Sequence, residues 1–251
     1  MPSPVNRRCF KVLLARAGAR TGAAVRRLWP GHCLVCRSPA AVAGIDLCAA
    51  CRRSLPWQRT ACPSCALPLA APAAACGHCQ RRPPPVAATR AAFRYEPPLD
   101  RLLPRLKFHG DLAAGRLCAG LMAEAFAADL ADAPRPEALL PLPLHRARLR
   151  RRGFDQTLEL ARPLARALGV PLRDDLLVRV RHTAPQSRLA APARRRNLRG
   201  AFAVRDDRPL PAHVALVDDV MTTGATLHAA AEALRRAGVA RVEAWVCARA
   251  G

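Results

Sequence analysis

The chain has 251 residues, of which 51% are hydrophobic and only 4% aromatic, so it is long enough for one substantial domain with a smaller satellite. Lys and Arg number 41 against 18 Asp and Glu, which gives a formal net charge of +23. This excess favours a polyanionic partner, either nucleic acid or an anionic metabolite, with scattered solvated arginines as the alternative. A membrane span is excluded because no apolar run is long enough, and Arg16 interrupts the N-terminal apolar segment too early for a secretory signal.

Residues 1–30 are expected to be a basic, flexible tail, and contact with a membrane or nucleic acid is one open role for it. Four C-x-x-C pairs follow at nearly even spacing. Two thiolates in such a knuckle bind one ion, and two knuckles complete a tetrahedral four-thiolate zinc site. The pattern predicts a small four-cysteine zinc-ribbon domain, a double zinc ribbon over residues 31–82, that needs metal to fold. Its candidate zinc ligands are Cys33, Cys36, Cys48, Cys51, Cys62, Cys65, Cys76 and Cys79.

The cysteine pattern leaves several alternatives open. The first pair can share an ion with the second, or the pairs can interleave, and a single zinc with half the thiols free is also compatible. His78 lies inside a knuckle and is either a ligand or a bystander. A redox dithiol is disfavoured because it predicts one pair at a helix start. Closed four-thiolate sites leave no open coordination position, so the zinc is expected to be structural. Cys118 and Cys247 are expected to be buried single thiols.

Residues 80–86, QRRPPPV, form a stiff spacer that marks the boundary to a larger domain over residues 88–251. Apolar runs and helical periodicity then alternate along the chain, which predicts a parallel sheet flanked by helices on both faces. The expected strands are 88–96, 137–143, 175–181, 213–219 and an alternating strand over 240–249, and the expected helices are 98–110 (broken at Pro104), 111–132, 154–169 and 225–238.

The segment ALVDDVMTTGAT, residues 215–226, places Asp218 and Asp219 at the end of a buried strand. Ligands of open parallel sheets bind beyond the carboxyl ends of the strands. Small residues around Gly224 let backbone amides approach an anion, and the helix N-terminus that follows favours a phosphate. The aspartates suit hydroxyl groups or a metal ion. A sugar phosphate satisfies both halves, whereas a P-loop nucleotide site is excluded because its motif is missing from the sequence.

Residues 214–227 resemble the phosphoribosyl pyrophosphate (PRPP) signature of type I phosphoribosyltransferases, with an apolar strand, two acids and T-T-G-x-T. The resemblance implies a type I phosphoribosyltransferase-like fold, in which Asp218 and Asp219 are catalytic and accept hydrogen bonds from the ribose hydroxyls. It also implies that Mg²⁺ bridges the ribose and the pyrophosphate. The implied PRPP-binding residues are Asp218, Asp219, Val220, Met221, Thr222, Thr223, Gly224, Ala225 and Thr226.

LKFHGD (106–111), PLPLHRARLRRRGFDQ (141–156), QSRLAAPARRRNLRGAF (186–202) and the cysteine-rich head together resemble the ComF family, also called GntX-like. These are competence-related proteins with a zinc-ribbon head and a phosphoribosyltransferase domain. The resemblance implies a cytoplasmic location and a part in DNA uptake during natural transformation. It further implies contact with single-stranded DNA, and a DNA-uptake helicase or recombination proteins as partners.

Several cations are candidates for contact with pyrophosphate or DNA, because Arg forks bind phosphate oxygens bidentately. These candidates are Lys107, Arg151, Arg152, Arg188 and Arg195, with solvated surface positions as the alternative. Residues 188–202 are expected to supply a mobile hood over the site. Asp155 stands where the family frequently has Asn, and it suits a helix cap. His145 and His182 are the nearest candidates for a base, but both are expected to be structural.

Three functions stay open from the sequence. The first is a Mg²⁺-dependent phosphoribosyltransferase with an unidentified acceptor, including one in nucleotide metabolism without a DNA role. The second is a DNA-uptake factor that binds PRPP or a related nucleotide, and the third is an inert DNA-binding scaffold. The intact acidic pair and T-T-G-A-T loop disfavour the third. The charge and the zinc ribbons favour a DNA role, and the scarcity of aromatic residues indicates binding through backbone electrostatics.

Overall fold

A computed structural model describes residues 31–39, 45–130, 133–181, 198, 200–205 and 207–251. The chain divides into two compact units, Met1–Ser54 and Leu55–Gly251. The described part of the first unit holds one short helix, α2 (Ala49–Arg53), with Cys48 at its N-cap. The other elements that the structure describes belong to the second unit.

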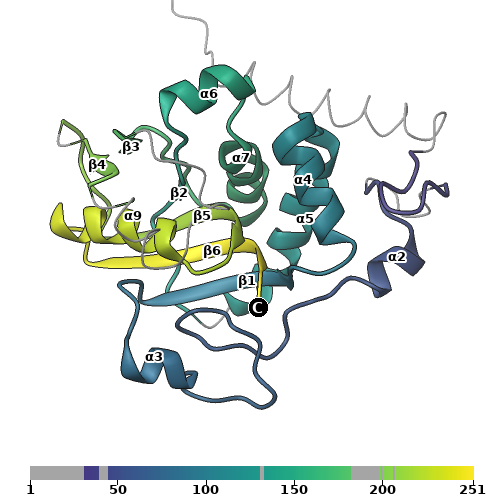
Figure 1. The fold of residues 1–251 in the computed structure, drawn as a ribbon, viewed down its shortest axis with the longest axis horizontal. Coiled ribbons are helices and arrows are strands. Elements are labelled where there is room, and N and C mark those ends of the chain that lie inside the picture. Colours follow the sequence, from purple (N-terminus) through teal and green to yellow (C-terminus); the bar gives the residue numbers. More distant parts are fainter. Residues whose placement is uncertain (1–30, 40–44, 131–132, 182–197, 199, 206) are drawn as a thin grey trace, which may run out of the picture. The chain divides into compact units, whose positions relative to one another are not determined.

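A four-stranded parallel sheet forms the centre of the second unit, in the order β1-β6-β5-β2 (Figure 1). Its strands are β1 (Ala88–Arg94), β2 (Ala138–Pro141), β5 (His213–Met221) and β6 (Arg241–Arg249). The first five residues of β5 are buried, as expected for a parallel strand covered on both faces. The predicted parallel sheet is confirmed.

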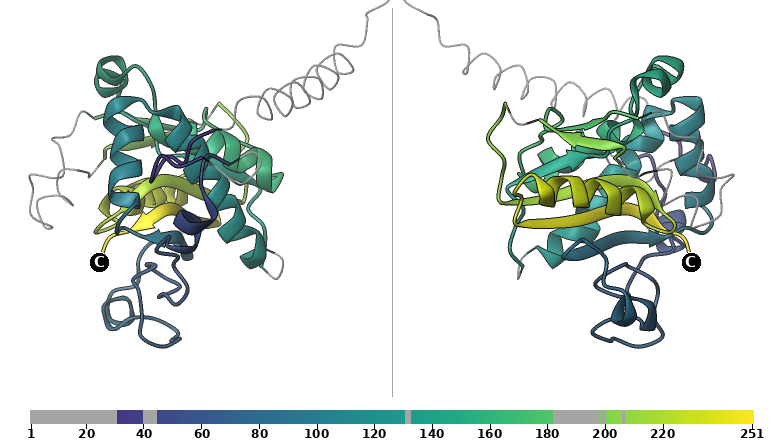
Figure 2. Two further views of the ribbon diagram at one scale, coloured as in Figure 1. Left: turned by 90° about the vertical axis from the view of Figure 1, so that its right-hand side faces the viewer. Right: turned by 60° about the vertical axis from the view of Figure 1, so that its left-hand side comes forward.

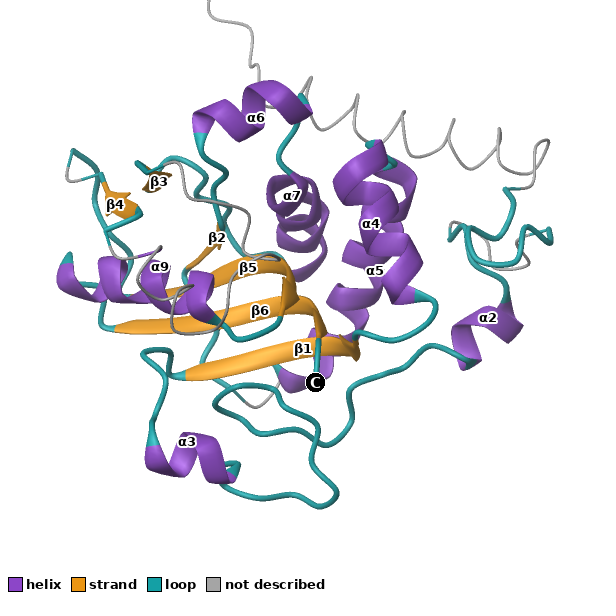
Figure 3. Ribbon diagram, viewed as in Figure 1, coloured by secondary structure: helices purple, strands orange, loops and turns teal. Residues whose placement is uncertain are grey.

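Helices cover both faces of this sheet (Figure 3). On one face, α5 contacts β1 and β6 while α7 contacts β5 and β2, and α4 packs on α5. On the other face, α9 contacts β5 and β6. The bounds are α4 (Leu99–His109), α5 (Leu112–Asp129), α7 (Gln156–Leu168) and α9 (Ala225–Arg236).

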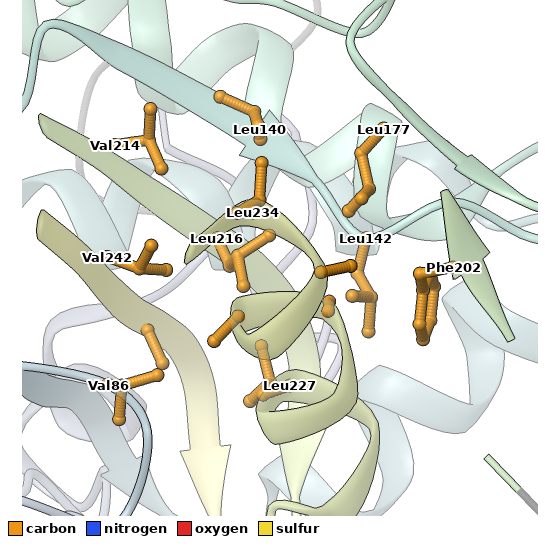
Figure 4. Close-up of a cluster of buried hydrophobic side chains, with 14 of the residues drawn as sticks. Val86, Leu140, Leu142, Leu177, Phe202, Val214, Leu216, Leu227, Leu234 and Val242 are labelled. Carbon is orange, nitrogen blue, oxygen red and sulfur yellow. The ribbon is translucent and has the colours of Figure 1, made fainter. Parts of the chain in front are cut away.

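The two faces of the sheet are filled by alternate residues of the same strands. Val214 and Leu216 of β5 join Leu227 and Leu234 of α9 in one hydrophobic cluster, which Figure 4 shows together with Val242 of β6. On the opposite face, the ring of Trp245 in β6 lies 5.4 Å from that of Phe126 in α5. Buried packing on both sides therefore fixes the register of β5 and the position of its carboxyl end.

Two parts of the fold were not expected from the sequence. A seven-residue helix, α6 (Arg146–Arg152), forms in the arginine run and ends at Gly153, whose φ is 82°. The expected strand at 175–181 is short (β3, Leu177–Arg179) and pairs antiparallel with β4 (Phe202–Val204), outside the main sheet. A three-residue strand such as β4 has too little pattern to be recognised in a sequence. The antiparallel pair lies near α9, which contacts β4 (Figure 2).

Two expectations about local structure were wrong. Helix α4 continues through Pro104, because Leu102, Leu103 and Leu106 are buried and their packing outweighs the hydrogen bond lost at proline. The last strand, β6, was expected to alternate between buried and exposed residues, but every residue after Arg241 is buried. It lies between two other strands and is covered on both faces. Cys118 and Cys247 are fully buried, as predicted.

The segment that holds Cys62, Cys65, Cys76 and Cys79 contains a short helix, α3 (Gly77–Arg81). It belongs to the same compact unit as the sheet. Residues 56–58 follow the edge of β1, where Gln58 N donates to Ala92 O at 2.9 Å and Arg94 N donates to Pro56 O at 2.8 Å. The independent folding of residues 31–82 stays a prediction. None of the helices in the described part of the chain combines the length and apolar character that crossing a bilayer requires.

Candidate functional site

The acidic pair lies at the carboxyl end of β5, which runs two residues further than the sequence predicts, to Met221. Asp219 is only 3% exposed, and Asp218 is partly buried. The Asp219 backbone N–H donates to Asp218 Oδ1 at 2.8 Å. Burial and the neighbouring Asp219 carboxylate raise the pKa of Asp218 well above its ordinary value. Two carboxyl groups this close therefore do not ionise alike.

Lys107 of α4 completes this acidic end of the site. Its Nζ lies 3.0 Å from Asp219 Oδ2. Burial acts to raise the pKa of Asp219, but Lys107 and hydrogen bonds outweigh it, so this pKa is lowered. Burial likewise acts to lower the pKa of Lys107, and the two aspartates outweigh it, so this pKa is raised. The Lys107–Asp219 pair is thus charged, whereas the Asp218 carboxyl keeps its proton to a higher pH than an ordinary aspartate does.

The loop after β5 has little room for side chains. Gly224 has a φ of 74°, and a Cβ there would lie 2.5 Å from Met221 Cε and 2.8 Å from His228 Nε2. Helix α9 begins at the next residue, and His228 N donates to Gly224 O at 2.8 Å. The exposed Thr223 hydroxyl accepts from Ala225 N at 3.4 Å. Thr222, Gly224 and Thr226 therefore come together at the N-terminus of α9, an arrangement suited to an anion.

A cavity of about 490 Å³ joins the acidic pair, the loop and a group of cations. Five cationic side chains line it, from three separate elements. Lys107, Arg151 and Arg152 were expected from the sequence, and Arg148 and Arg179 were not singled out. The predicted residues along its wall are Lys107, Arg151, Arg152, Asp218, Asp219, Val220, Met221, Thr222, Gly224, Ala225 and Thr226. Thr223 stands beside this wall, and Arg188 and Arg195 lie outside the described residues.

Arg179 is the residue that sequence reasoning missed most clearly. It sits in the short strand β3 and is 9% exposed, while its neighbour Val180 is 53% exposed. Its guanidinium lies 5.4 Å from the centre of the Phe202 ring. Burial and the nearby Arg148 lower the pKa of Arg179 to about 10, which leaves it a cation at neutral pH. The sequence offered one signal for this residue: Arg179 is two positions after Leu177, so the two side chains lie on the same face of a strand.

The segment between β2 and α7 is organised by side-chain caps. Asp155 Oδ1 accepts from Thr157 N at 3.0 Å, and Asp155 Oδ2 accepts from Leu144 N at 3.1 Å, so Asp155 caps α7 as expected. His145 Nδ1 accepts from Ala147 N at 3.2 Å, which gives this histidine a structural place at the start of α6. Arg152 donates to Gln156 Oε1. His182 lies outside the described residues, as do residues 188–197 and 199 of the hood expected over residues 188–202, and the last hood residue, Phe202, begins β4.

The eight predicted cysteines form two separate clusters, in the sequential order of the pairs. They are Cys33, Cys36, Cys48 and Cys51, and Cys62, Cys65, Cys76 and Cys79. In each cluster the four Sγ atoms lie within 4.8 Å of one another. Cys36 Sγ and Cys48 Sγ are 3.7 Å apart, as are Cys65 Sγ and Cys76 Sγ. Tetrahedral zinc with Zn–S bonds near 2.3 Å requires about 3.8 Å between sulfurs, so both clusters fit a zinc ion.

The two clusters repeat the same local structure. In the first, Cys33 N donates to Ser38 O at 2.7 Å, and in the second Cys62 N donates to Leu67 O at 2.9 Å. The residue after each first knuckle has a positive φ, 66° at Arg37 and 53° at Ala66. A five-residue helix follows each second knuckle's first cysteine. His78 is not among the residues that could hold a metal in the described part of the chain.

Comparison with known proteins agrees with this architecture. The family described as "Double zinc ribbon domain" matches residues 24–80, and the family "Phosphoribosyl transferase domain" matches residues 155–251. The fold and these matches define a protein with a phosphoribosyltransferase domain preceded by a double zinc ribbon.

Relatives that match most of the chain identify the family to which the protein belongs. The chain is 37% identical to "DNA utilization protein YhgH" of Salmonella typhi over 223 residues, which cover 88% of this chain and 97% of the relative. The YhgH protein of Escherichia coli K12 is 35% identical over the same length. "Competence protein F" of Haemophilus influenzae is 35% identical over 231 residues, 87% of this chain and 97% of the relative. The chain therefore belongs to the ComF family.

Proposed function

We propose that this protein binds phosphoribosyl pyrophosphate with Mg²⁺ in the cavity at the carboxyl end of β5, and that it acts in DNA uptake. The observation that carries the proposal is the juxtaposition of Asp218 and Asp219 with the Thr222–Thr226 loop and five cationic side chains around one cavity. The aspartates suit ribose hydroxyls, the loop suits the 5′-phosphate, and the cations suit the pyrophosphate. A simple phosphate or an uncharged sugar would use only part of this surface.

The acidic pair has distinct tasks in this proposal. Asp218 and Asp219 accept hydrogen bonds from the ribose 2′- and 3′-hydroxyls, so both carboxylates are needed as acceptors. Because burial and Asp219 raise the pKa of Asp218 in the free protein, and ligand binding requires its carboxylate as an acceptor, binding is expected to become tighter as pH rises through that pKa. Lys107 stays beside Asp219 and adds positive charge where the pyrophosphate approaches. The chain's own groups thus orient the sugar and balance the ligand's negative charge.

The donor set fits magnesium that arrives with the ligand. Among the described residues, the acidic side chains that line the cavity are Asp218 and Asp219 alone. Mg²⁺ keeps several waters and binds through one or two carboxylates together with substrate phosphates. When bound, it would neutralise the pyrophosphate and favour its departure from the ribose. Asp218 and Asp219 are the residues that would hold it, directly or through the ribose hydroxyls.

Each four-cysteine cluster is proposed to hold a structural zinc ion. The sulfur distances fit a closed tetrahedral site, which leaves no position for a substrate. Zinc bound at both clusters would order segments that have little hydrophobic core of their own. Zinc analysis of the purified protein is expected to give two ions per chain, and a Cys36→Ser or Cys65→Ser variant one.

Calorimetric titration with phosphoribosyl pyrophosphate and Mg²⁺ tests the ligand site. We expect binding by the wild type, and at least about a hundredfold loss of affinity for the Asp218→Ala, Asp219→Ala double variant, because two charge-assisted hydrogen-bond acceptors are removed. Arg162→Met, an exposed change on α7, is the matched control and is expected to bind as the wild type does. A wild type that binds no phosphoribosyl pyrophosphate contradicts the proposal.

Two further measurements separate the alternatives. Release of pyrophosphate on adding candidate acceptors would favour an active phosphoribosyltransferase, including one in nucleotide metabolism. Single-stranded DNA binding that falls steeply with salt, and survives the Asp changes, would support a DNA surface separate from the cavity.

Phe108, 68% exposed at the cavity, is the largest exposed aromatic among the described residues. Its Phe108→Leu variant tests whether base stacking adds to DNA affinity.

A further inference from the structure

The first knuckle of the second cysteine cluster is held by the sheet through three successive carbonyl groups. Thr89 of β1 donates from its backbone N–H to Pro63 O at 2.8 Å and from its hydroxyl to Ser64 O at 2.8 Å. Arg249, the last residue of β6, donates from Nε to Cys65 O at 2.9 Å. Each carbonyl of the segment Pro63–Cys65 is therefore bound by the domain that carries the cavity.

Arg249 makes a second contact, which reaches the ligand loop. Its Nη1 donates to Met221 O at 3.3 Å, and the backbone N–H of Ala250 donates to the same oxygen at 2.9 Å. Met221 is the last residue of β5 and directly precedes Thr222. Arg249 is only 9% exposed, so its planar guanidinium is a short and rigid connection between Cys65 and Met221.

Packing reinforces this connection. Ala66, the residue after the knuckle, is 1% exposed and belongs to the same hydrophobic cluster as Met221 and Leu227. Cys65 packs against that cluster from its edge. Close-packed interiors transmit displacements because they hold little free volume. A shift of the knuckle is therefore expected to disturb both the Met221 carbonyl and the side chains beneath the loop.

We propose that Arg249 is a positioning residue, through which zinc in the second cluster fixes the ligand loop at Thr222–Thr226. Zinc bound by Cys62, Cys65, Cys76 and Cys79 orders the knuckle, the knuckle orients Arg249, and Arg249 holds the carbonyl on which the loop begins. The first cluster belongs to the other compact unit and serves as the comparison. The part of this inference that concerns ligand affinity rests on the proposed function, and the part that concerns loop order does not.

Hydrogen exchange of the loop amides in the ligand-free, full-length protein tests the coupling directly. Cys65→Ser and Cys36→Ser are a matched pair, because each removes the second thiol of the first knuckle in its cluster. After each variant is shown to have lost one zinc, exchange at residues 222–226 is expected to be at least about tenfold faster in Cys65→Ser and unchanged in Cys36→Ser. Equal exchange in the two variants would overturn the proposal.

A second pair of variants keeps the test decisive if Cys65→Ser does not fold. Arg249→Met preserves length and both zinc sites but removes the donors to Cys65 and Met221. Arg241→Met, at the opposite end of the same strand, is the control. We expect faster loop exchange in Arg249→Met with two zinc ions retained, partial rescue in Arg249→Lys, and wild-type exchange in Arg241→Met. Wild-type exchange in Arg249→Met would contradict the proposal.

The affinity for phosphoribosyl pyrophosphate provides the second readout. Arg249→Met is expected to bind it about tenfold more weakly than the wild type, and Cys36→Ser as tightly as the wild type. If the wild type binds none, the proposed function fails while the exchange data still decide whether zinc orders the loop. If the wild type binds and Arg249→Met binds equally well, with equal loop exchange, the coupling is refuted and the proposed function stands.

Discussion

The two halves of the cavity are built in different ways. The half that carries the acidic pair and the phosphate loop comes from one continuous segment, residues 216–226, at the end of a buried central strand. The cationic half comes from three elements that are distant in sequence: Lys107 on α4, Arg148, Arg151 and Arg152 on α6, and Arg179 on β3. The first half depends on local backbone geometry, and the second depends on how the elements pack.

Because the two halves are built differently, substitutions in them are expected to affect ligand affinity in different ways. A change in the loop half alters a backbone held by β5, α9 and Gly224, so its cost includes strain and steric overlap. A change in the cationic half removes one of several donors at the cavity wall, and the remaining donors partly compensate. The loop half is therefore expected to lose affinity for every ligand, and the cationic half only for ligands that carry pyrophosphate.

Among single substitutions, Gly224→Ala is expected to have the largest effect. The new Cβ would meet Met221 Cε at 2.5 Å on a backbone with φ of 74°, so overlap adds to left-handed strain. Together these cost about 3 kcal/mol, and affinity for both ribose 5-phosphate and phosphoribosyl pyrophosphate should fall by about a hundredfold. Gly169→Ala, with φ of 66° and no atom within 4 Å, is the control for strain alone. If Gly224→Ala and Gly169→Ala lose equal stability in urea unfolding, steric overlap with Met221 contributes nothing at Gly224.

The two aspartates are expected to have opposite effects on stability. The pKa of Asp218 is raised in the folded protein, so ionisation destabilises it progressively as pH rises above the unfolded pKa of about 4. Asp218→Asn should therefore stabilise the ligand-free protein at pH 7, by about 1 kcal/mol or more, with a smaller gain at pH 4. Asp219 has a lowered pKa, so its contribution is present above about pH 4 and is lost as pH falls.

Asp219→Asn is accordingly expected to destabilise the protein at pH 7 by about 1–3 kcal/mol, because Lys107 loses its charged partner. The loss should shrink as pH falls below 4. Urea unfolding of both variants at pH 4, 5.5 and 7 measures how the free energy of unfolding changes with pH. Parallel pH profiles for the two variants would show that the carboxylates are equivalent and that Lys107 does not distinguish them.

Arg179→Met is expected to have the smallest effect and the most selective one. Affinity for phosphoribosyl pyrophosphate should fall by about tenfold, the loss typical of one charge-assisted hydrogen bond, while affinity for ribose 5-phosphate should change little. Arg179 stays charged well above neutral pH, so the loss should not vary between pH 6 and 8. Calorimetric titration of both ligands into the wild type and the variant measures the loss of affinity for each ligand. Equal losses for the two ligands would place Arg179 outside the pyrophosphate region.

The same contrast explains what the sequence made predictable. The strand, the acidic pair and the T-T-G-A-T loop are contiguous, so their order in the sequence is their order in the site. Arg151 and Arg152 were expected because they belong to a conspicuous run, but the helix that presents them was not. Arg179 comes from a strand of three residues that pairs outside the main sheet. Its guanidinium lies over the Phe202 ring and near the charge of Arg148, and no local sequence pattern encodes those contacts.

The cysteine spacing shows a similar limit. Even spacing predicted two metal clusters but left their pairing open, because both pairings place four thiols near one another in sequence. In the structure the grouping is sequential, and each cluster begins with the same kind of turn, at Cys33–Arg37 and at Cys62–Ala66. The contact between Cys65 and Arg249 joins residues at opposite ends of the larger unit, so it depends on the folded sheet.

A crystal structure of the protein with phosphoribosyl pyrophosphate and Mg²⁺ tests the central claim most directly. We expect the 5′-phosphate on the amides and hydroxyls of Thr222–Thr226, the ribose hydroxyls on Asp218 and Asp219, and the pyrophosphate toward Arg148, Arg152 and Arg179. A ligand held by the arginines alone, with the loop and the acidic pair making no contact, would contradict it.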